Sequence, residues 1–154
     1  MPKAKPLARK PPDLPALGRR GVELLAAVPM FAELSRRQLK RIAELTQVKE
    51  ASAGSMLVTA GAPGSASFFV IVEGKAEVVK DRRAVAALGP GDFFGELGVI
   101  DGGRRTASVV ASSDLVALRL SRTAFREVIE AEPAIGTRIM EALVARVREL
   151  EGVE

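Results

Sequence analysis

The middle of the sequence, from about Gly54 to Leu120, is broken into short β-rich runs by glycine, proline and small polar residues. The runs lie at residues 56–59, 68–72, 75–79, 84–88, 106–111 and 115–120. The run at 68–72 is continuously apolar, which is typical of a strand covered on both faces. Short strands at this spacing predict a closed sandwich or jelly roll.

Two of the connections between these runs are short enough to predict hairpins. Residues 73–74 separate the runs at 68–72 and 75–79, and residues 112–114 join the last two runs into a pair. In the last run large apolar residues alternate with smaller or polar ones, and this period predicts a half-buried strand.

The N-terminal side of this β region has a helical pattern. The first helix is expected over residues 19–27, and Pro29 ends it because proline cannot continue a helix. Ser35 and Gln38 form a capping-box pair, with apolar residues following at helical spacing. We therefore expect a second helix from Ser35 to about residue 45.

Two more helices are expected after the strands. Ser121 is placed to cap the first, and Pro133 occupies the first turn of a longer helix that runs to about Leu150. On that last helix four apolar residues fall at heptad spacing, namely Met140, Leu143, Val147 and Leu150. A homodimer seam and packing onto the β-roll both explain this stripe. The fold class predicted is mainly β, a jelly roll with N-terminal helices and two C-terminal helices.

Residues 1–18 contain five prolines, which predicts a flexible basic tail ahead of a domain at 19–154. The first 20 residues hold six basic side chains against Asp13, so they carry more positive charge than the whole chain, whose formal net charge is +4. The domain itself is close to neutral, which argues against nucleic acid as a partner. The tail is expected either to be solvated or to touch a membrane surface, a nucleic acid or an acidic partner.

No apolar run approaches the ~20 residues of a transmembrane helix. Prolines interrupt the basic N-terminus and no hydrophobic stretch follows it, so a signal peptide is not expected. A cytoplasmic location is the resulting expectation.

The sequence has no cysteine, histidine, asparagine, tryptophan or tyrosine. Without cysteine and histidine, the usual ligands of zinc and of most transition metals are missing. The common nucleophile systems and the usual general base near neutral pH are missing as well. We therefore expect neither an enzyme nor a protein with a metal or a resident cofactor.

The segment from residue 89 to residue 108 is rich in glycine and contains both a carboxylate and a guanidinium. Glycines allow backbone N–H groups to approach a ligand, and a short helical turn after Gly95 would direct such groups at an anion. Arg105 has the planar charged fork that suits phosphate oxygens. Glu96 would be repelled by phosphate, so a sugar hydroxyl is its natural partner. The segment predicts a site for a sugar phosphate.

Phe-Gly-Glu-Leu at 94–97, followed by Arg-Thr-Ala-Ser at 105–108, resembles the phosphate-binding cassette of cyclic nucleotide-binding domains. This family includes the catabolite activator protein, regulatory subunits of cyclic-AMP-dependent kinase and nucleotide-gated channels. The resemblance covers roughly residues 28–150, with supporting likeness at 28–31 and 72–75. It implies the double-stranded β-helix fold and a cyclic nucleotide ligand.

The resemblance also implies a role for each site residue. Arg105 would pair with the exocyclic phosphate oxygen and Glu96 with the ribose 2′-hydroxyl. Backbone N–H groups around four residues would hold the sugar phosphate: Gly95, Leu97, Gly98 and Thr106. The Thr106 hydroxyl reaches either the phosphate or a guanine amino group in such sites, which leaves cAMP and cGMP both open.

The function expected is a stand-alone receptor for cAMP or cGMP that passes ligand-linked movement of its C-terminal helices to a protein partner. One alternative is a transcription regulator of the catabolite activator type, against which we note that no helix-turn-helix follows residue 150. The other is a degenerate interaction module with an empty pocket.

Overall fold

The computed structural model describes residues 11–58, 67–95 and 107–150, and the account below concerns these. The N-terminal part contains the 3₁₀ turns η1 (Pro15–Leu17) and η2 (Pro29–Phe31) and the helices α1 (Arg19–Ala26) and α2 (Arg36–Leu45). The C-terminal part contains α4 (Arg122–Ala131) and α5 (Pro133–Leu150). The strands between them are β1 (Gln47–Ala51), β2 (Met56–Val58), β3 (Ser67–Glu73), β4 (Ala76–Lys80), β5 (Arg83–Leu88), β6 (Phe93–Phe94), β7 (Ser108–Ala111) and β8 (Leu115–Ser121).

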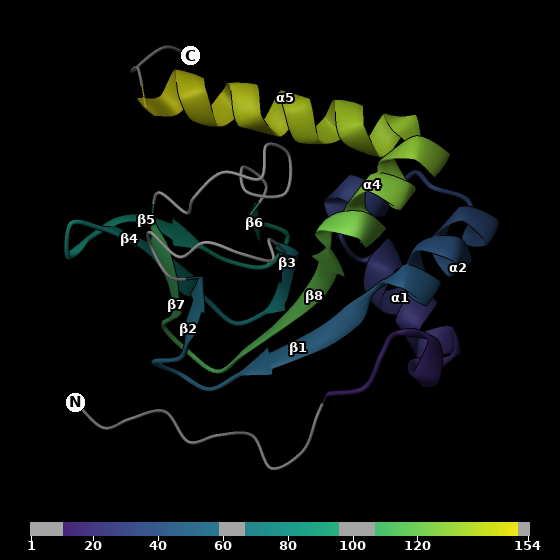
Figure 1. The fold of residues 1–154 in the computed structure, drawn as a ribbon, viewed down its shortest axis with the longest axis horizontal. Coiled ribbons are helices and arrows are strands. Elements are labelled where there is room, and N and C mark those ends of the chain that lie inside the picture. Colours follow the sequence, from purple (N-terminus) through teal and green to yellow (C-terminus); the bar gives the residue numbers. More distant parts are fainter. Residues whose placement is uncertain (1–10, 59–66, 96–106, 151–154) are drawn as a thin grey trace.

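The strands form two antiparallel sheets that face each other as a roll (Figure 1). One sheet has the order β1-β8-β3-β6 and the other the order β2-β7-β4-β5. Consecutive strands alternate between the sheets over much of the chain, as in a jelly roll. The helices gather beside the first sheet, and α5 runs across the roll. The predicted fold class is confirmed.

The two expected hairpins are wrong. Strand β3 pairs with β8 and β6 but not with β4, and β7 pairs with β4 and β2 but not with β8. The short connections at 73–75 and 112–114 instead carry the chain from one sheet to the other. A turn of two or three residues has the same sequence signature in a hairpin and in a crossing between sheets, because glycine and small polar residues suit both kinds of turn. The one two-residue hairpin among the described strands joins β4 to β5.

The crossing turns meet at one end of the roll, which we call the closed end. The Lys75 N–H donates to Ser113 Oγ at 2.9 Å, and the Ala53 N–H donates to Asp114 Oδ1 at 2.9 Å. Gly74 has a φ of +88°, and a Cβ there would lie 2.2 Å from the carbonyl oxygen of Asp114. Only glycine fits this crossing without strain.

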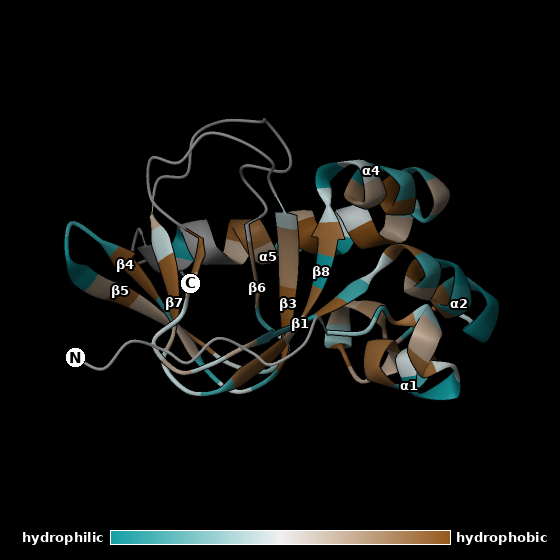
Figure 2. Cartoon of the chain, turned by 60° about the horizontal axis from the view of Figure 1, so that its bottom comes forward, coloured by the Kyte–Doolittle hydropathy of each residue, from teal (hydrophilic) through white to brown (hydrophobic). Residues whose placement is uncertain are grey.

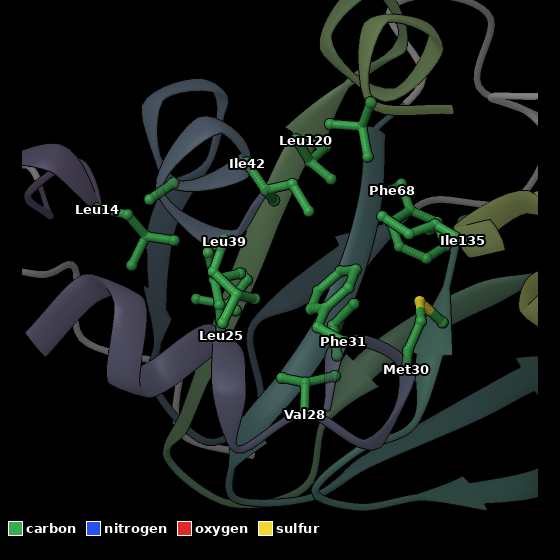
Figure 3. Packing of buried hydrophobic residues seen from close by; sticks show 14 of the residues in the cluster. Leu14, Leu25, Val28, Met30, Phe31, Leu39, Ile42, Phe68, Leu120 and Ile135 are labelled. Carbon is green, nitrogen blue, oxygen red and sulfur yellow. The ribbon is translucent and has the colours of Figure 1, made fainter. Parts of the chain in front are cut away.

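Strand β3 lies at the centre of the fold and buries both of its faces, as its apolar run predicts. Phe68 and Val70 face the helices, whereas Phe69 and Ile71 face the interior between the sheets. The helix-side core draws its apolar side chains from η2, α1, α2, α4 and α5 (Figure 3). Figure 2 shows hydrophobic residues along β3 and β8 and hydrophilic ones on the outer turns of α1 and α2.

Strand β8 is buried more completely than its alternating pattern predicts. Leu118 and Leu120 pack toward the helices, but Ala117 on the other face is fully buried in the interior between the sheets. Arg119 on the same face donates hydrogen bonds to Ser67 Oγ and to Gln47 Oε1. The prediction that β8 is half-buried is wrong. In the sequence Ala117 and Arg119 look like an exposed face, but the second sheet covers this face of the strand.

The capping predictions are confirmed. The Gln38 N–H donates to Ser35 Oγ at 3.2 Å, and the Ser35 N–H donates to Gln38 Oε1 at 2.8 Å. The Ala124 N–H donates to Ser121 Oγ at 3.1 Å, and α5 begins at Pro133.

The expectation of a flexible tail as far as residue 18 is wrong for its last part. The Leu14 N–H donates to the carbonyl of Thr46 at 3.1 Å, and the Val48 N–H donates to that of Pro12 at 3.2 Å. Leu14 is fully buried in the helix-side core, so one large apolar side chain among the prolines fixes this segment on the domain. Residues 1–10 lie outside the described residues.

Candidate functional site

The segment predicted to bind a ligand runs from β6 in one sheet to β7 in the other. The register places its two ends, Gly95 and Ser108, at the end of the roll opposite the closed end, since Phe94 pairs with Phe69 and Ser108 with Val79. Of the predicted site residues, Gly95 is described. It is half-buried and has a φ of +87°, a conformation that glycine adopts readily. Five others lie outside the described residues, namely Glu96, Leu97, Gly98, Arg105 and Thr106.

A tight turn at residues 89–92 fixes the chain just before this segment. The Gly91 N–H donates to the carbonyl of Ile71 at 2.8 Å, and the Ile71 N–H donates to that of Asp92 at 2.9 Å. Asp92 Oδ2 also accepts from the Gly89 N–H at 2.8 Å. The turn is thus held on the central strand β3, and the start of the candidate site has a rigid support.

Two phenylalanines anchor β6 on opposite faces of its sheet. Phe94 stacks on Phe69 with ring centroids 4.8 Å apart, on the side of the sheet interior. On the helix side, the ring centroids of Phe93 and Phe68 are 5.6 Å apart. This two-residue strand was not predicted, because two residues are too few to show the alternation of apolar and polar side chains that is typical of a strand. The pair of aromatic residues between Gly91 and Gly95 was the available signal.

The described walls of the roll interior are apolar and mostly small, comprising Ala51, Val58, Phe69, Ile71, Ala76, Phe94, Val109, Ala111, Leu115 and Ala117. Among the described residues the buried polar side chains are Thr46 and Ser67, and no charged residue is buried. These walls therefore carry no charge.

The turn at 89–92 is connected to the last helix through η2. A Cβ at Gly91 would lie 3.4 Å from Cδ of Pro29, so the two segments are in close contact. Arg138 of α5 donates a hydrogen bond from Nη1 to the carbonyl of Pro29 at 3.2 Å, and its Nη2 forms an ion pair with Glu33. The turn at 89–92, which supports the candidate site, and helix α5 therefore both contact η2. Sequence analysis missed Arg138, because a single arginine on a helix carries no signal of its contacts.

In the part of the chain that the structure describes, no three acidic side chains gather in a way that could hold a metal ion. Nor does any described helix combine the length and apolar character needed to cross a bilayer.

The family model for the cyclic nucleotide-binding domain matches residues 48–132, which include the whole of the candidate segment. A cAMP-dependent protein kinase regulatory subunit of Aspergillus fumigatus is 36% identical over 107 residues, which is 68% of this chain and 26% of that protein. A cyclic nucleotide-gated potassium channel of Mesorhizobium japonicum is 35% identical over 116 residues, which is 75% of this chain and 32% of that protein.

Among solved structures, the catabolite activator protein of Thermus thermophilus superposes with a TM-score of 0.72 at 27% identity. The match covers 80% of this chain and 60% of that one. The chain spans about a quarter to a third of the length of the two relatives matched by sequence.

Proposed function

The chain belongs to the cyclic nucleotide-binding domain family, and on that premise we propose that it is a regulatory receptor for a cyclic mononucleotide, cAMP or cGMP. The observation that carries the proposal is the family match over residues 48–132, a range that includes Phe-Gly-Glu-Leu at 94–97 and Arg-Thr-Ala-Ser at 105–108. The relatives named for cAMP dependence and for nucleotide gating support the same ligand class.

The proposed site combines apolar walls with a polar cassette. Arg105 is assigned to the exocyclic phosphate oxygen and Glu96 to the ribose 2′-hydroxyl. Backbone N–H groups at Gly95, Leu97, Gly98 and Thr106 are assigned to the sugar phosphate. The absence of charge from the described walls supports this division, because a buried phosphate needs a charged partner. The proposal includes no catalytic step, which agrees with the lack of histidine and cysteine.

The proposed output is a ligand-linked shift of α4 and α5 that a protein partner detects. A ligand changes such an equilibrium only by its different affinity for the two arrangements. The contact from the turn at 89–92 through Pro29 to Arg138 supports a route by which the cassette could favour one placement of α5.

A homodimer through α5 belongs to the proposal. Met140 and Val144 on this helix are 63% and 52% exposed, and an apolar hollow of about 330 Å³ lies beside them between α4 and α5. Leu143 packs on the helix-side core, so it supports the alternative of packing within the chain. Sedimentation equilibrium should show a dimer that Met140→Glu weakens at least about tenfold, whereas Val85→Glu, at an exposed apolar residue on β5, should not. A monomeric wild-type chain would rule the dimer out, and equal effects of both changes would rule out α5 as its interface.

A thermal melt tests the ligand directly. Ligand at about 100 times its dissociation constant should add ~2.7 kcal/mol to the free energy of unfolding. For a chain of this length the melting temperature should rise by about 5–10 °C. The nucleotide that gives the larger rise at equal concentration is the better ligand. If neither cAMP nor cGMP shifts the melt, the pocket is empty and the interaction-module alternative is favoured.

A further inference from the structure

The outer face of α2 carries a row of cations. Arg37, Lys40 and Arg41 occupy positions i, i+3 and i+4, so they share one face of the helix, and Arg36 lies beside them. All four are exposed, while Leu39, Ile42 and Ala43 bury the opposite face. Like charges at this spacing repel one another, and Arg36 and Arg37 in the first turn also oppose the helix dipole. This face is therefore electrostatically unfavourable in the isolated chain.

These cations have no ion-pair partner within residues 11–58, 67–95 and 107–150. The ion pair found there joins Arg138 to Glu33. Glu44 follows Lys40 at i+4 and Arg41 at i+3, yet it forms no ion pair with either within 4.0 Å. Three exposed cations that form no ion pair on one helix face are available to bind carboxylates of another molecule.

The cations line a hollow and not a flat surface. Arg37, Lys40 and Arg41 border an open groove of about 770 Å³, whose far side is formed by Ala131 and Glu132 at the end of α4. Gln38 donates a hydrogen bond from Nε2 to Glu132, so the two walls of the groove are joined. Glu44 and Glu132 add negative charge to the same groove.

The groove contains both cations and carboxylates, and this combination favours some anionic partners over others. Phosphates of nucleic acid or of a lipid surface form a continuous negative surface, which Glu44 and Glu132 would repel. The domain outside the basic N-terminus is also close to neutral, so it offers no broad positive face. A protein segment can place carboxylates opposite the cations and avoid them opposite Glu44.

We propose that the groove between α2 and the end of α4 is a docking site for an acidic segment of a partner protein, with carboxylates that meet Arg37, Lys40 and Arg41. This inference goes beyond the proposed nucleotide site and does not depend on it. The groove lies on the helical side of the molecule, where Figure 2 shows hydrophilic residues on the outer turns of α2.

The test uses the full chain and a fluorescein-labelled alanine-based peptide with glutamates at i, i+3, i+4 and i+7. Anisotropy should show saturable binding that weakens with added salt. The variant Arg37→Gln, Lys40→Gln, Arg41→Gln should bind about tenfold more weakly. The matched control Lys80→Gln, Arg82→Gln, Arg83→Gln removes the same charge from the exposed β4–β5 turn and should stay within about twofold of wild type.

Several results would overturn the proposal. Absence of saturable peptide binding to the wild-type chain would do so. Equal loss in both variants would show that only net charge matters. Tighter binding of phosphatidylserine-containing vesicles or of a short DNA duplex, at the same concentration of negative charge, would assign the groove to a membrane or to nucleic acid if the α2 variant loses that binding and the β4–β5 variant keeps it. A thermal melt monitored by circular dichroism should show the α2 variant folded and at least as stable as wild type, because the substitutions relieve repulsion.

Discussion

Replacement of Gly74 by alanine should lower the free energy of unfolding by about 2–5 kcal/mol. A Cβ at this position would lie 2.2 Å from the Asp114 carbonyl oxygen and 2.9 Å from Cα of Leu115, so backbone must move to admit it. The φ of +88° adds the cost of a left-handed conformation for a residue with a side chain, about 1–2 kcal/mol. Overpacking of a well-filled site adds about 1–3 kcal/mol. Urea denaturation measures the total.

Gly54 provides the matched control for this prediction. It has a φ of +90°, but no atom lies within 4 Å of its ideal Cβ. Gly54→Ala should therefore carry the conformational cost alone, about 1–2 kcal/mol. If Gly74→Ala destabilises the chain no more than Gly54→Ala does, the crossing turn at the closed end is not packed as described.

Replacement of Arg105 by alanine should weaken cyclic nucleotide binding by roughly 2–5 kcal/mol, because a buried phosphate would lose its charged partner. In dissociation constants this corresponds to a loss of about 30-fold to several thousand-fold. Arg105→Lys should recover part of the affinity, since a lysine keeps the charge but lacks the planar fork. Calorimetric titration of each variant gives the values.

The neighbouring Arg104 supplies the control for Arg105. Arg104→Ala changes the net charge by the same amount one residue away, so a general electrostatic effect would weaken both variants alike. The role assigned to Arg105 requires that its replacement cost far more than that of Arg104. Unchanged affinity in Arg105→Ala would refute that role.

Local features of this fold were predictable because each depends on a few neighbouring residues. The Ser35–Gln38 capping box, the Ser121 cap and the start of α5 at Pro133 all follow from such short patterns. The buried central strand was predictable from its unbroken apolar run.

Strand pairing was not predictable in the same way. The turns at 73–75 and 112–114 look like hairpins, but the strands beside them pair with strands about 30 to 50 residues away along the chain. The burial of Leu14 also depends on a distant element, since its backbone partner is Thr46. Such contacts are fixed by tertiary packing and leave no local period in the sequence.

The candidate site likewise has a part that depends on neighbouring residues and a part that depends on distant ones. Gly95, Glu96 and Arg105 were proposed from residue type and spacing alone, and their roles stay predictions. The apolar walls, the support from β3 and the contact of Pro29 with Arg138 combine residues from separate strands and helices. Only the fold brings these residues together.

Isothermal titration of the wild-type chain with cAMP and with cGMP tests the central claim most directly. The account predicts a saturable heat for at least one of the two nucleotides, with one site per chain and a much weaker signal in Arg105→Ala. No measurable heat with either nucleotide at ~1 mM, where a binding free energy of only about 4 kcal/mol would register, would contradict it.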